Sequence, residues 1–315
     1  MPGPRPPGCG EQGFGVVFND PMDSIGSIRD SVRRALAEDL DRADLSLDSD
    51  VTSRLSVPPG AAGRARMVAK SDGVLAGSAC AVEAFRALDP QSDVRPELRD
   101  GQKFSRGDLI LQVRGRMRAL LAAERTALNF VQRLSGIATT TRAFVEAVKG
   151  TRAKVLDTRK TTPGLRLLEK QAVVAGGGHN HRFGLHDQVL LKENHFGCAR
   201  PASYEEVVRR CVREQDRPVI AEARNTEEAT AAVRGGATVI LLDNFTPGES
   251  LRAAVAAVRA SAASLGRSVE VEASGGVDLA SVRSFAECGV DRISIGALTH
   301  SAPAVDLSML VEGVA

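Results

Sequence analysis

The amino-acid sequence predicts an α/β fold in two parts, and two features of the chain lead to that prediction. From about residue 154 onward, short apolar runs alternate with helical stretches, which is typical of a parallel sheet covered by helices. Before residue 136, helical and strand-like segments are mixed and separated by turn signals such as Asp72-Gly73 and Gly107-Asp108. We therefore predict a small α/β sandwich followed by parallel strands, in a sheet that is open or closed into a barrel.

Composition argues against nucleic acid and membranes as partners of this chain. Of its 315 residues, 43% are hydrophobic and 25% are charged, and the net charge is only +2. Without Trp and with one Tyr, the chain has few platforms for base stacking, so we expect no nucleic-acid partner. No apolar run approaches the roughly 18 residues of a membrane span. The five widely spaced cysteines form no CxxC pair and favour a reducing compartment, the cytoplasm.

The N-terminal half is expected to hold a tail and then a mixed domain. Residues 1–22 are rich in Pro and Gly and lack the apolar region of a signal peptide, so we predict a disordered tail. We assign residues 23–135 to an α/β sandwich domain. Its predicted helices are Ser27–Leu40, Val82–Leu88 and Met117–Leu134, and its predicted strands are Arg64–Lys70, Val74–Gly77, Val94–Leu98 and Leu109–Val113.

A charged residue interrupts the apolar stripe of the long helix predicted over Met117–Leu134. Arg125 lies on that stripe, four residues after Leu121 and three before Leu128. Either the arginine snorkels at the edge of a packed face, or that face meets a ligand or another subunit.

Residues 136–297 are assigned to an α/β barrel domain that carries the active site. A complete barrel of this type has eight strands, whereas the sequence offers six, so we predict an incomplete barrel. Helices are expected over Tyr204–Glu214, Glu227–Arg234, Glu249–Ser261 and Leu279–Cys288. The predicted strands are Lys154–Asp157, Val189–Lys192, Val219–Glu222, Val239–Asp243, Val269–Glu272 and Arg292–Ile295.

Polar residues gather where these predicted strands end. The carboxyl ends of the strands of an α/β barrel, with the loops that follow them, form its active site. A lysine at the end of an apolar strand is rarely buried without a partner, so we expect Lys192 to line that site. The residues that close or directly follow a strand are Asp157, Lys192, Glu222, Asp243 and Ser274-Gly275.

The stretch between Asp157 and His195 is rich in cations and glycine, which predicts a pocket for a small, highly charged anion. The segment Asp157–Gly164 is expected to open a helix, with Pro163 near the first turn. Gly176-Gly177-Gly178 is expected to form an anion-binding nest. A capped helix with solvated charges and a flexible surface loop are the respective alternatives. The cations are Arg159, Lys160, His179, His181, Arg182, His186, Lys192 and His195.

The carboxylates of Glu222 and Asp243 end successive predicted strands. They would hold Mg²⁺ beside a diphosphate or stabilise a sugar cation, unless they form a structural ion pair with Lys192. Ser274-Gly275-Gly276 and Gly296 follow the last two strands, where backbone N–H groups often bind phosphate, although ordinary tight turns also use such residues. His300 either contacts the same phosphate or caps a helix.

Several long motifs, in this order, resemble the quinolinate phosphoribosyltransferases, also called nicotinate-nucleotide pyrophosphorylases (carboxylating). The resemblance covers about Ile28 to Ser301, nearly all of the chain except the tail. The motifs are Glu124–Thr139, Asp157–Arg166, Gly176–Arg182, Leu191–His195, Leu241–Phe245, Glu272–Val277 and Leu298–Ser301.

The resemblance implies a type II phosphoribosyltransferase-like fold, in which an N-terminal α/β sandwich packs on an incomplete α/β barrel. It implies that residues 298–315 return to the N-terminal domain, and that a homodimer shares its active sites through Arg125. It also implies that quinolinate and 5-phosphoribosyl 1-diphosphate give nicotinate mononucleotide, diphosphate and CO2, with Mg²⁺, in NAD biosynthesis.

Roles for single residues follow from the same resemblance. Arg159, His181, Arg182 and Lys192 would hold the quinolinate carboxylates, and Arg125 would reach the substrate from the other subunit. Lys160 would serve the diphosphate or the substrate. Glu222 and Asp243 would face Mg²⁺ and the ribose, and Ser274, Gly275, Gly296 and His300 would bind the 5′-phosphate. The expected catalytic residues are Lys160, Lys192, Glu222 and Asp243.

The chain departs from the family at two places. The family tends to run Glu-Val-Glu-Val where this chain has Ile220-Ala221-Glu222-Ala223-Arg224, so an outer acid is lost and secondary metal contacts change. Glu193 stands where the family commonly has Asp.

Other functions stay open on the sequence. A related phosphoribosyltransferase would act on another aromatic acid. A metal-dependent barrel hydrolase would use His179, His181, Lys192 and Asp243 as a binuclear site, although the many arginines fit it poorly. A non-enzymatic sensor of dicarboxylates or nucleotides would keep the anion pocket, but Glu222 and Asp243 would weaken simple anion binding.

Overall fold

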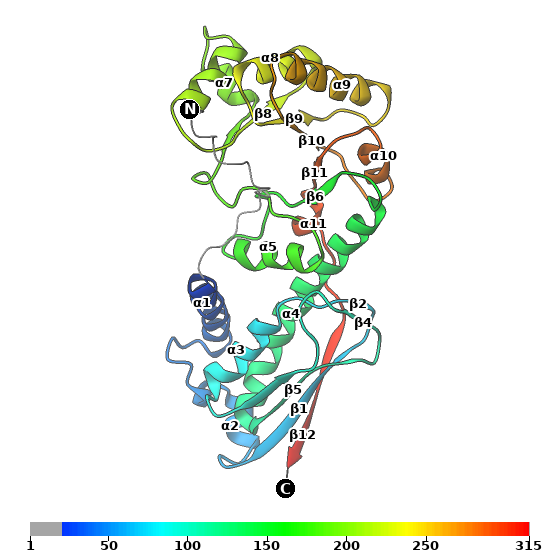
Figure 1. Ribbon diagram of the computed structural model, residues 1–315. Helices are drawn as coiled ribbons and strands as arrows, with labels where there is room; N and C mark the ends of the chain where they lie inside the picture. Colours follow the sequence, from blue (N-terminus) through cyan, green and yellow to red (C-terminus); the bar gives the residue numbers. More distant parts are fainter. Residues whose placement is uncertain (1–20, 315) are drawn as a thin grey trace, which may run out of the picture.

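The computed structural model describes residues 21–314, and one long helix connects its two parts (Figure 1). Helix α4 (Met117–Ala147) runs from the N-terminal sheet to the barrel strands. It continues well past Leu134, where the sequence predicted its end, because Ile137, Ala138 and Phe144 extend its buried face. The assigned boundary between residues 135 and 136 therefore falls inside a continuous helix.

An antiparallel sheet forms the N-terminal part, with the strand order β12-β1-β5-β3. Its members are β1 (Ala62–Ala69), β3 (Asp93–Pro96), β5 (Leu109–Arg116) and β12 (Leu307–Val314). Along β1, Ala65 and Met67 are buried whereas Arg64 and Arg66 are exposed, the alternation of a sheet with one face in water. Helices α3 (Ser78–Leu88) and α4 pack on the buried side of the sheet, and α1 (Pro21–Leu40) packs on α3. Smaller elements are η1 (Leu47–Ser49), α2 (Val51–Ser56) and the strand pair β2 (Gly73–Val74) and β4 (Lys103–Phe104).

Both ends of the described chain belong to this N-terminal part. The last strand, β12, pairs antiparallel with β1, so that Val311 lies opposite Ala65. Helix α1 begins at Pro21, earlier than the predicted Ser27, and so includes the last two residues of the predicted tail. The rest of the tail predicted for residues 1–22 lies outside the described residues.

Six parallel strands form the barrel, in the order β6-β11-β10-β9-β8-β7. Strands β6 and β7 follow each other in the chain but lie at opposite edges of the sheet, so the barrel is open between them. At that opening His179 adds a single parallel bridge to Leu156. The expected incomplete barrel is thus confirmed, and each predicted run is a strand. The strands are β6 (Lys154–Leu156), β7 (Val189–Leu191), β8 (Val219–Ala223), β9 (Val239–Asp243), β10 (Glu270–Ser274) and β11 (Arg292–Ser294).

The turn before α5 corrects one prediction. Leu165 N–H donates to the carbonyl oxygen of Thr162 at 3.0 Å, and Gly164 has φ +79°. Pro163 therefore lies in a tight turn rather than in the first turn of a helix. The helices of the barrel part are α5 (Arg166–Ala175), α6 (Glu193–Cys198), α7 (Tyr204–Arg213), α8 (Thr226–Gly235), α9 (Glu249–Ser264), α10 (Val282–Ala286) and α11 (Ala297–His300).

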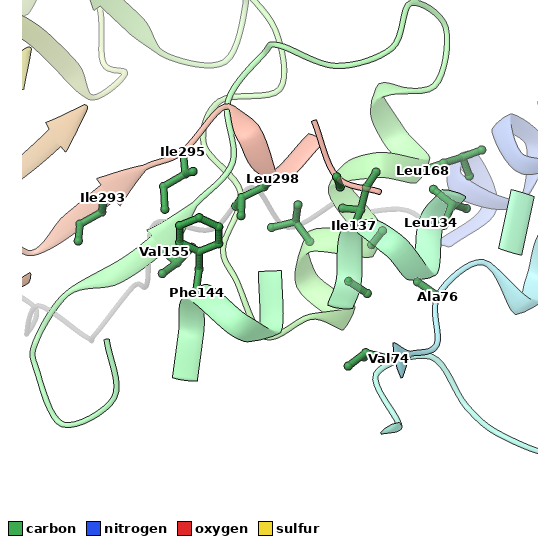
Figure 2. Packing of buried hydrophobic residues seen from close by; sticks show 14 of the residues in the cluster. Val74, Ala76, Leu134, Ile137, Phe144, Val155, Leu168, Ile293, Ile295 and Leu298 are labelled. Carbon is green, nitrogen blue, oxygen red and sulfur yellow. The ribbon is translucent and has the colours of Figure 1, made fainter. Parts of the chain in front are cut away.

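One cluster of buried side chains extends through both parts of the molecule. Figure 2 shows Leu134 and Phe144 of α4 together with Ala76 from the N-terminal part and Val155 and Ile295 from the barrel. Because this packing is continuous, α4 holds the barrel in a fixed position relative to the N-terminal sheet. No helix among residues 21–314 is both long and apolar enough to cross a membrane.

Candidate active site

A cavity of about 640 Å³ opens at the carboxyl ends of the barrel strands. Its size is typical of sites that enclose small molecules. Among the residues to which the resemblance assigns a role, Arg125 and Glu222 do not line it. His186 and His195, two cations of the predicted anion pocket, do not line it either. Those that do are Arg159, Lys160, His181, Arg182, Lys192, Asp243, Ser274, Gly275, Gly296 and His300.

Arg182 brings a buried guanidinium group to this cavity. The residue is only 6% exposed, yet it forms no ion pair with any residue in the described range. Its Nη1 donates to the carbonyl oxygen of Gln188 at 3.2 Å, and its Nε is buried without a hydrogen-bond partner in the described part of the chain. Burial and the nearby charge of Arg159 lower the pKa of Arg182, and the charge of Asp187 opposes this. A buried guanidinium group that no carboxylate contacts directly is unfavourable, so this geometry favours an anionic ligand.

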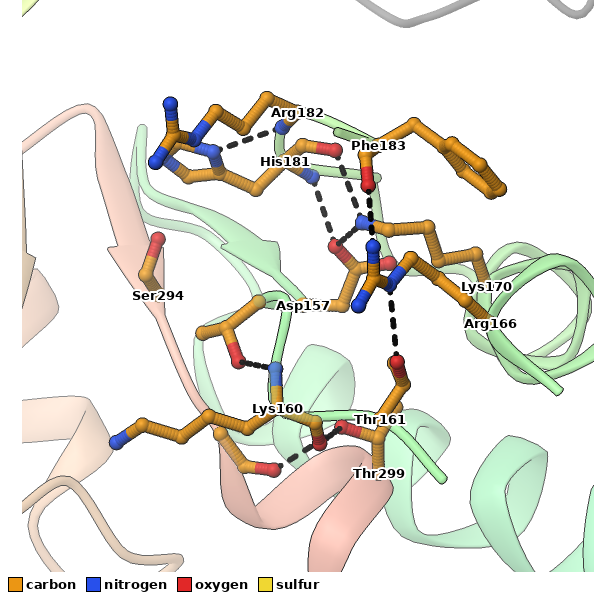
Figure 3. A network of polar contacts seen from close by, with 12 residues as sticks. Asp157, Lys160, Thr161, Arg166, Lys170, His181, Arg182, Phe183, Ser294 and Thr299 are labelled. Carbon is orange, nitrogen blue, oxygen red and sulfur yellow. Dashed lines mark hydrogen bonds and ion pairs between the residues drawn. The ribbon is translucent and has the colours of Figure 1, made fainter. Parts of the chain in front are cut away.

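A buried ion pair holds the segment that precedes Arg182 (Figure 3). Asp157, directly after β6, pairs with Lys170 of α5, and both residues are 0% exposed. Asp157 accepts the backbone N–H of His181 at 2.8 Å, and Lys170 donates to the carbonyl oxygen of His181 at 2.9 Å. Burial raises the pKa of Asp157 to about 6 although Lys170 opposes this, and burial lowers the pKa of Lys170. Asp157 therefore holds the backbone of His181 in place, and it does not itself line the cavity.

Glu272 of β10 is fully buried and lines the cavity, although the sequence did not single it out as a site residue. Its Oε1 lies 3.2 Å from Nε2 of His181, and its Oε2 lies 3.1 Å from Nε of Arg292. Burial alone would raise the pKa of Glu272, but His181, Arg292 and a hydrogen bond from Ser294 hold it at about 2. The alternation Val-Glu-Val-Glu over residues 269–272 was the available signal, since an acid that points into a barrel needs a partner.

Three charged groups meet at the ends of β7, β8 and β9. Lys192 Nζ lies 3.2 Å from Oε2 of Glu222, so the structural ion pair considered for these residues is present. The Lys192 side chain is 53% exposed and lines the cavity, whereas the Glu222 side chain is 10% exposed and contacts the cavity wall through Lys192. Burial and the charge of Glu222 raise the pKa of Asp243, and Lys192 and Lys160 oppose this rise.

Glycines shape the opposite wall, near Lys160 and His300. A Cβ on Gly275 would lie 2.2 Å from Oδ1 of Asn244, and the φ of Gly275 is +99°. A Cβ on Gly296 would lie 2.9 Å from Cδ of Lys160 and 3.1 Å from Nε2 of His300. At Gly275 only glycine fits, whereas a Cβ on Gly296 would require the Lys160 and His300 side chains to shift. The small residues leave backbone N–H groups open to a ligand. The sequence missed Asn244, which has φ +58° and lines the cavity.

The glycine run Gly176–Gly178 serves helix packing and does not form the predicted anion-binding nest. A Cβ on Gly176 would lie 2.6 Å from the carbonyl oxygen of Ala138, and one on Gly178 would lie 2.7 Å from Cγ2 of Thr141. None of the three glycines lines the cavity. They allow the end of α5 to pack closely on α4, so the prediction of a ligand-binding nest was wrong.

The geometry does not assemble the binuclear metal site of a hydrolase. His179 is exposed and lies outside the cavity that His181 lines. Over residues 21–314, no group of three or more His, Cys, Asp and Glu side chains is placed to hold a metal ion.

Arg125 is exposed on α4 and lies outside the cavity of its own chain. Its neighbours Thr126 and Leu128 are buried, whereas Arg125 makes no hydrogen bond or ion pair within the described range. Its charged group is therefore free to meet another molecule.

Comparison with known proteins agrees with this geometry. Family models for the N-terminal and C-terminal domains of quinolinate phosphoribosyl transferase match residues 50–135 and 137–310. The nicotinate-nucleotide pyrophosphorylase (carboxylating) of Mycobacterium leprae is 40% identical over 287 residues, which covers 89% of this chain and 96% of that protein. A probable enzyme of the same name from Bacillus subtilis is 40% identical over 250 residues, which covers 78% of this chain and 82% of that protein.

A solved structure is also similar over most of the chain. The structure of nicotinate-nucleotide pyrophosphorylase from Francisella tularensis has a TM-score of 0.83 and 35% identity, covering 91% of this chain and 97% of that one. The two domain models together match most of the chain, in the order in which its two parts occur. This chain therefore belongs to the quinolinate phosphoribosyltransferase family.

Proposed function

We propose that this chain transfers the phosphoribosyl group of 5-phosphoribosyl 1-diphosphate to quinolinate. The products are nicotinate mononucleotide, diphosphate and CO2, a step of NAD biosynthesis. The observation that carries this proposal is the buried, unpaired guanidinium of Arg182, which lines the same cavity as Arg159, Lys160 and Lys192. The names of the similar proteins, which are carboxylating pyrophosphorylases of nicotinate nucleotide, support it.

Electrostatics explains why the reaction needs such a cavity. Quinolinate and the ribosyl donor together bring about six negative charges, which repel one another in solution. Each charge-assisted contact to a cation of the cavity contributes roughly 1.5–3 kcal/mol. We assign the quinolinate carboxylates to Arg159, Arg182 and Lys192. We assign the phosphate groups of the donor to Lys160, His300 and the backbone of Ser274, Gly275 and Gly296.

Mg²⁺ is the cofactor that we propose for this site. Burial and the charge of Glu222 raise the pKa of Asp243, so a divalent cation beside both carboxylates would relieve their repulsion. Two carboxylates are fewer ligands than Mg²⁺ takes, which suits an ion that is shared with the donor diphosphate and water. When bound, Mg²⁺ would neutralise charge on the leaving diphosphate. Instead of an outer acid, this chain has Arg224, which pairs with Glu193 at 3.1 Å and Glu228 at 2.8 Å.

The residues act by position and charge rather than by forming a bond to the substrate. The bond between the anomeric carbon and diphosphate breaks, and Asp243 stabilises the positive charge that develops on the ribose. The pyridine nitrogen of quinolinate then bonds to the anomeric carbon. The resulting pyridinium accepts the electron pair that remains when the adjacent carboxylate leaves as CO2, and the ring carbon takes up a proton.

We further propose a homodimer in which Arg125 enters the active site of the partner subunit. Its exposure on α4 and its absence from the lining of its own cavity support this arrangement. The described cysteines are free thiols, which suits the cytoplasm, the compartment that we propose.

Product analysis tests the proposed reaction. The purified protein is incubated with quinolinate, 5-phosphoribosyl 1-diphosphate and Mg²⁺, and we expect nicotinate mononucleotide and CO2 in equal amounts. Nicotinate serves as the comparison substrate, since its transfer would give the same nucleotide without CO2. A higher kcat/KM with nicotinate or another aromatic acid than with quinolinate would assign the chain a different acceptor. No nucleotide from any acceptor would refute the proposal.

A further inference from the structure

We infer that the buried ion pair of Arg133 and Glu169 is a positioning unit for the half of the cavity that takes the ribosyl donor. Neither residue lines the cavity. This role rests on the proposed function and adds two supporting residues to it. It depends on a series of contacts that lead from the pair to Lys160 and His300, two of the residues that we assign to the phosphate groups of the donor.

Glu169 of α5 is fully buried, and both oxygens of its carboxylate are engaged. Oε1 accepts from Nε of Arg133 at 3.3 Å and from Nη2 of Arg133 at 3.0 Å. The same oxygen accepts the hydroxyl of Thr162 at 2.8 Å, and Oε2 accepts the backbone N–H of Thr162 at 3.0 Å. Thr162 lies two residues after Lys160, in the segment between β6 and α5. Because Arg133 belongs to α4, the pair fixes this segment to the long helix.

Arg133 also holds a second segment of the site, the short helix α11. Its Nη1 donates to the carbonyl oxygen of Ala302 at 2.8 Å, and its Nη2 donates to the carbonyl oxygen of Thr299. These two carbonyl groups lie at the end of α11 and just after it, since the helix ends at His300. A guanidinium group at this place satisfies carbonyl groups that a helix leaves free at its last turn. The backbone that carries His300 is thus attached to α4.

The two segments are bonded to each other as well (Figure 3). The hydroxyl of Thr299, a fully buried residue, donates to the carbonyl oxygen of Lys160 at 2.8 Å and lies 3.2 Å from the carbonyl oxygen of Gly296. The side chains of Lys160 and His300 then both come close to Gly296, where a Cβ would lie 2.9 Å from Cδ of Lys160 and 3.1 Å from Nε2 of His300. Contacts outside the cavity therefore hold Lys160, Gly296 and His300 in one arrangement.

Loss of this pair should affect the two substrates unequally. Lys160 and His300 lie on the two segments that the pair holds, and both are assigned to the donor. Arg182 and Lys192, which are assigned to quinolinate, lie before and directly after β7, away from these contacts. Of the cations assigned to quinolinate, only Arg159 adjoins a bonded residue. Loss of a supporting residue that fixes ligand-binding groups costs roughly 10–100-fold, so we expect this cost to fall mainly on the donor.

Thr299→Val tests the bond to Lys160 while it preserves shape and charge. Valine has no hydroxyl, so the carbonyl oxygen of Lys160 loses this donor. Thr141→Val is the matched control, since Thr141 is also fully buried but its hydroxyl has no hydrogen-bond partner among the described residues. We expect the KM for the donor to rise at least about fivefold in Thr299→Val and less than about twofold in Thr141→Val. The KM for quinolinate should stay within about twofold of the wild-type value in both.

Arg133→Met tests the pair itself, with Arg142→Met as its control. Arg142 lies on the same helix and its Nε donates to the carbonyl oxygen of Gly176 at 2.8 Å, so it has the same charge and the same kind of contact, at the end of α5. Arg133→Met leaves Glu169 buried without its counter-charge, so the variant is also combined with Glu169→Gln, which removes that charge. We expect the KM for the donor to rise at least about tenfold in both Arg133 variants, and less than about twofold in Arg142→Met.

An unchanged KM for the donor, in Thr299→Val or in a folded Arg133 variant, would contradict the inference. A rise of both KM values by the same factor would contradict it too, because the pair would then support the fold as a whole and not the donor half of the cavity. If the Arg133 variants do not fold, the comparison of Thr299→Val with Thr141→Val decides alone. A wild-type protein that forms no nucleotide from any acceptor would remove the proposed function and this inference together, whereas an active one with unselective variants would remove the inference alone.

Discussion

Lys192 and Glu222 pair at the carboxyl ends of neighbouring strands, with 3.2 Å between Nζ and Oε2. Asp243 is coupled to both, since Glu222 raises its pKa and Lys192 lowers it. A dicarboxylate beside Lys192 and a cation beside Glu222 would give each member of the pair a new counter-charge. The ion pair therefore lies where the proposed quinolinate and ribosyl sites meet.

Replacement of Asp243 by alanine tests the proposed role of its carboxylate. Without it, positive charge that develops on the ribose loses its nearest negative group, and we expect kcat to fall roughly 10²–10³-fold. Quinolinate binding should stay measurable, because the cations of the cavity remain. Steady-state kinetics with titration calorimetry checks both points, and near-normal turnover would refute the role of Asp243.

The coupling of Lys192 to Asp243 predicts a shift in the pH profile of kcat. The ionised form of Asp243 is the active one, so activity is lost as pH falls through its raised pKa. Lys192→Met removes a charge that lowers this pKa, and the acid limb of the profile should move to higher pH. Lys149→Met, an exposed lysine outside the cavity, is the control and should leave the limb in place. A limb that moves to lower pH in Lys192→Met would contradict the coupling.

Two adjacent glycines in the proposed phosphate site predict effects of different size. Gly275 and Gly276 both have positive φ, so alanine strains the backbone by about 1–2 kcal/mol at either position. At Gly275 the new Cβ would also lie 2.2 Å from Asn244, whereas at Gly276 it would meet nothing within 4 Å. We expect Gly275→Ala to raise the KM for the ribosyl donor at least about tenfold more than Gly276→Ala does. Equal KM values for the two variants would argue against a backbone phosphate site here.

The buried pair of Asp157 and Lys170 predicts a pH-dependent loss of stability. Lys170→Met leaves Asp157 without its counter-charge, which lowers the free energy of unfolding by about 3–5 kcal/mol at neutral pH. Burial already raises the pKa of Asp157 to about 6, and loss of Lys170 raises it further. A carboxyl group whose folded pKa is raised destabilises the fold only above its unfolded pKa of about 3.9, so the loss should shrink as pH falls from 7.5 to 5. Urea unfolding at both pH values checks this, and a loss that grows toward acid pH would contradict it.

Subunit exchange tests the proposed sharing of active sites. Arg125→Ala and Lys192→Ala proteins should each keep only weak residual activity, because each lacks one cation of every site. In a mixed dimer one site keeps both cations, so activity should reappear at up to about one quarter of the wild-type level after random exchange. Proven exchange of labelled subunits without any recovery of activity would rule out shared sites.

The barrel strands were predictable because strands buried on both faces read as continuous apolar runs, of which Val239–Asp243 is an example. The end of α4 was not predictable, because the pair Ser135-Gly136 is typical of the end of a helix. In the structure a Cβ on Gly136 would lie 2.0 Å from the carbonyl oxygen of Pro303, so this glycine serves a close contact with a segment far along the chain. Long-range packing of this kind leaves no local pattern in the sequence.

The candidate site shows the same division. Lys192 and Asp243 were correctly predicted to line the cavity, because each lies at the end of an apolar run that reads as a strand. Glu272 escaped notice because its role depends on His181 and Arg292, which reach it from other strands and loops. Gly176–Gly178 were wrongly predicted to bind an anion. A glycine that lets two helices approach closely cannot be told apart, in sequence, from a glycine that lets a ligand approach the backbone.

The affinity of Arg182→Met for quinolinate, measured by titration calorimetry, tests the central claim most directly. Arg166→Met is the control, since Arg166 bonds to Thr161 and to the carbonyl oxygen of Phe183 and does not line the cavity. Loss of a buried cation that pairs with a carboxylate weakens binding by about 2–5 kcal/mol, so the Kd for Arg182→Met should rise at least about 30-fold. A Kd within about threefold of the wild-type value would show that the buried guanidinium does not receive the substrate carboxylate.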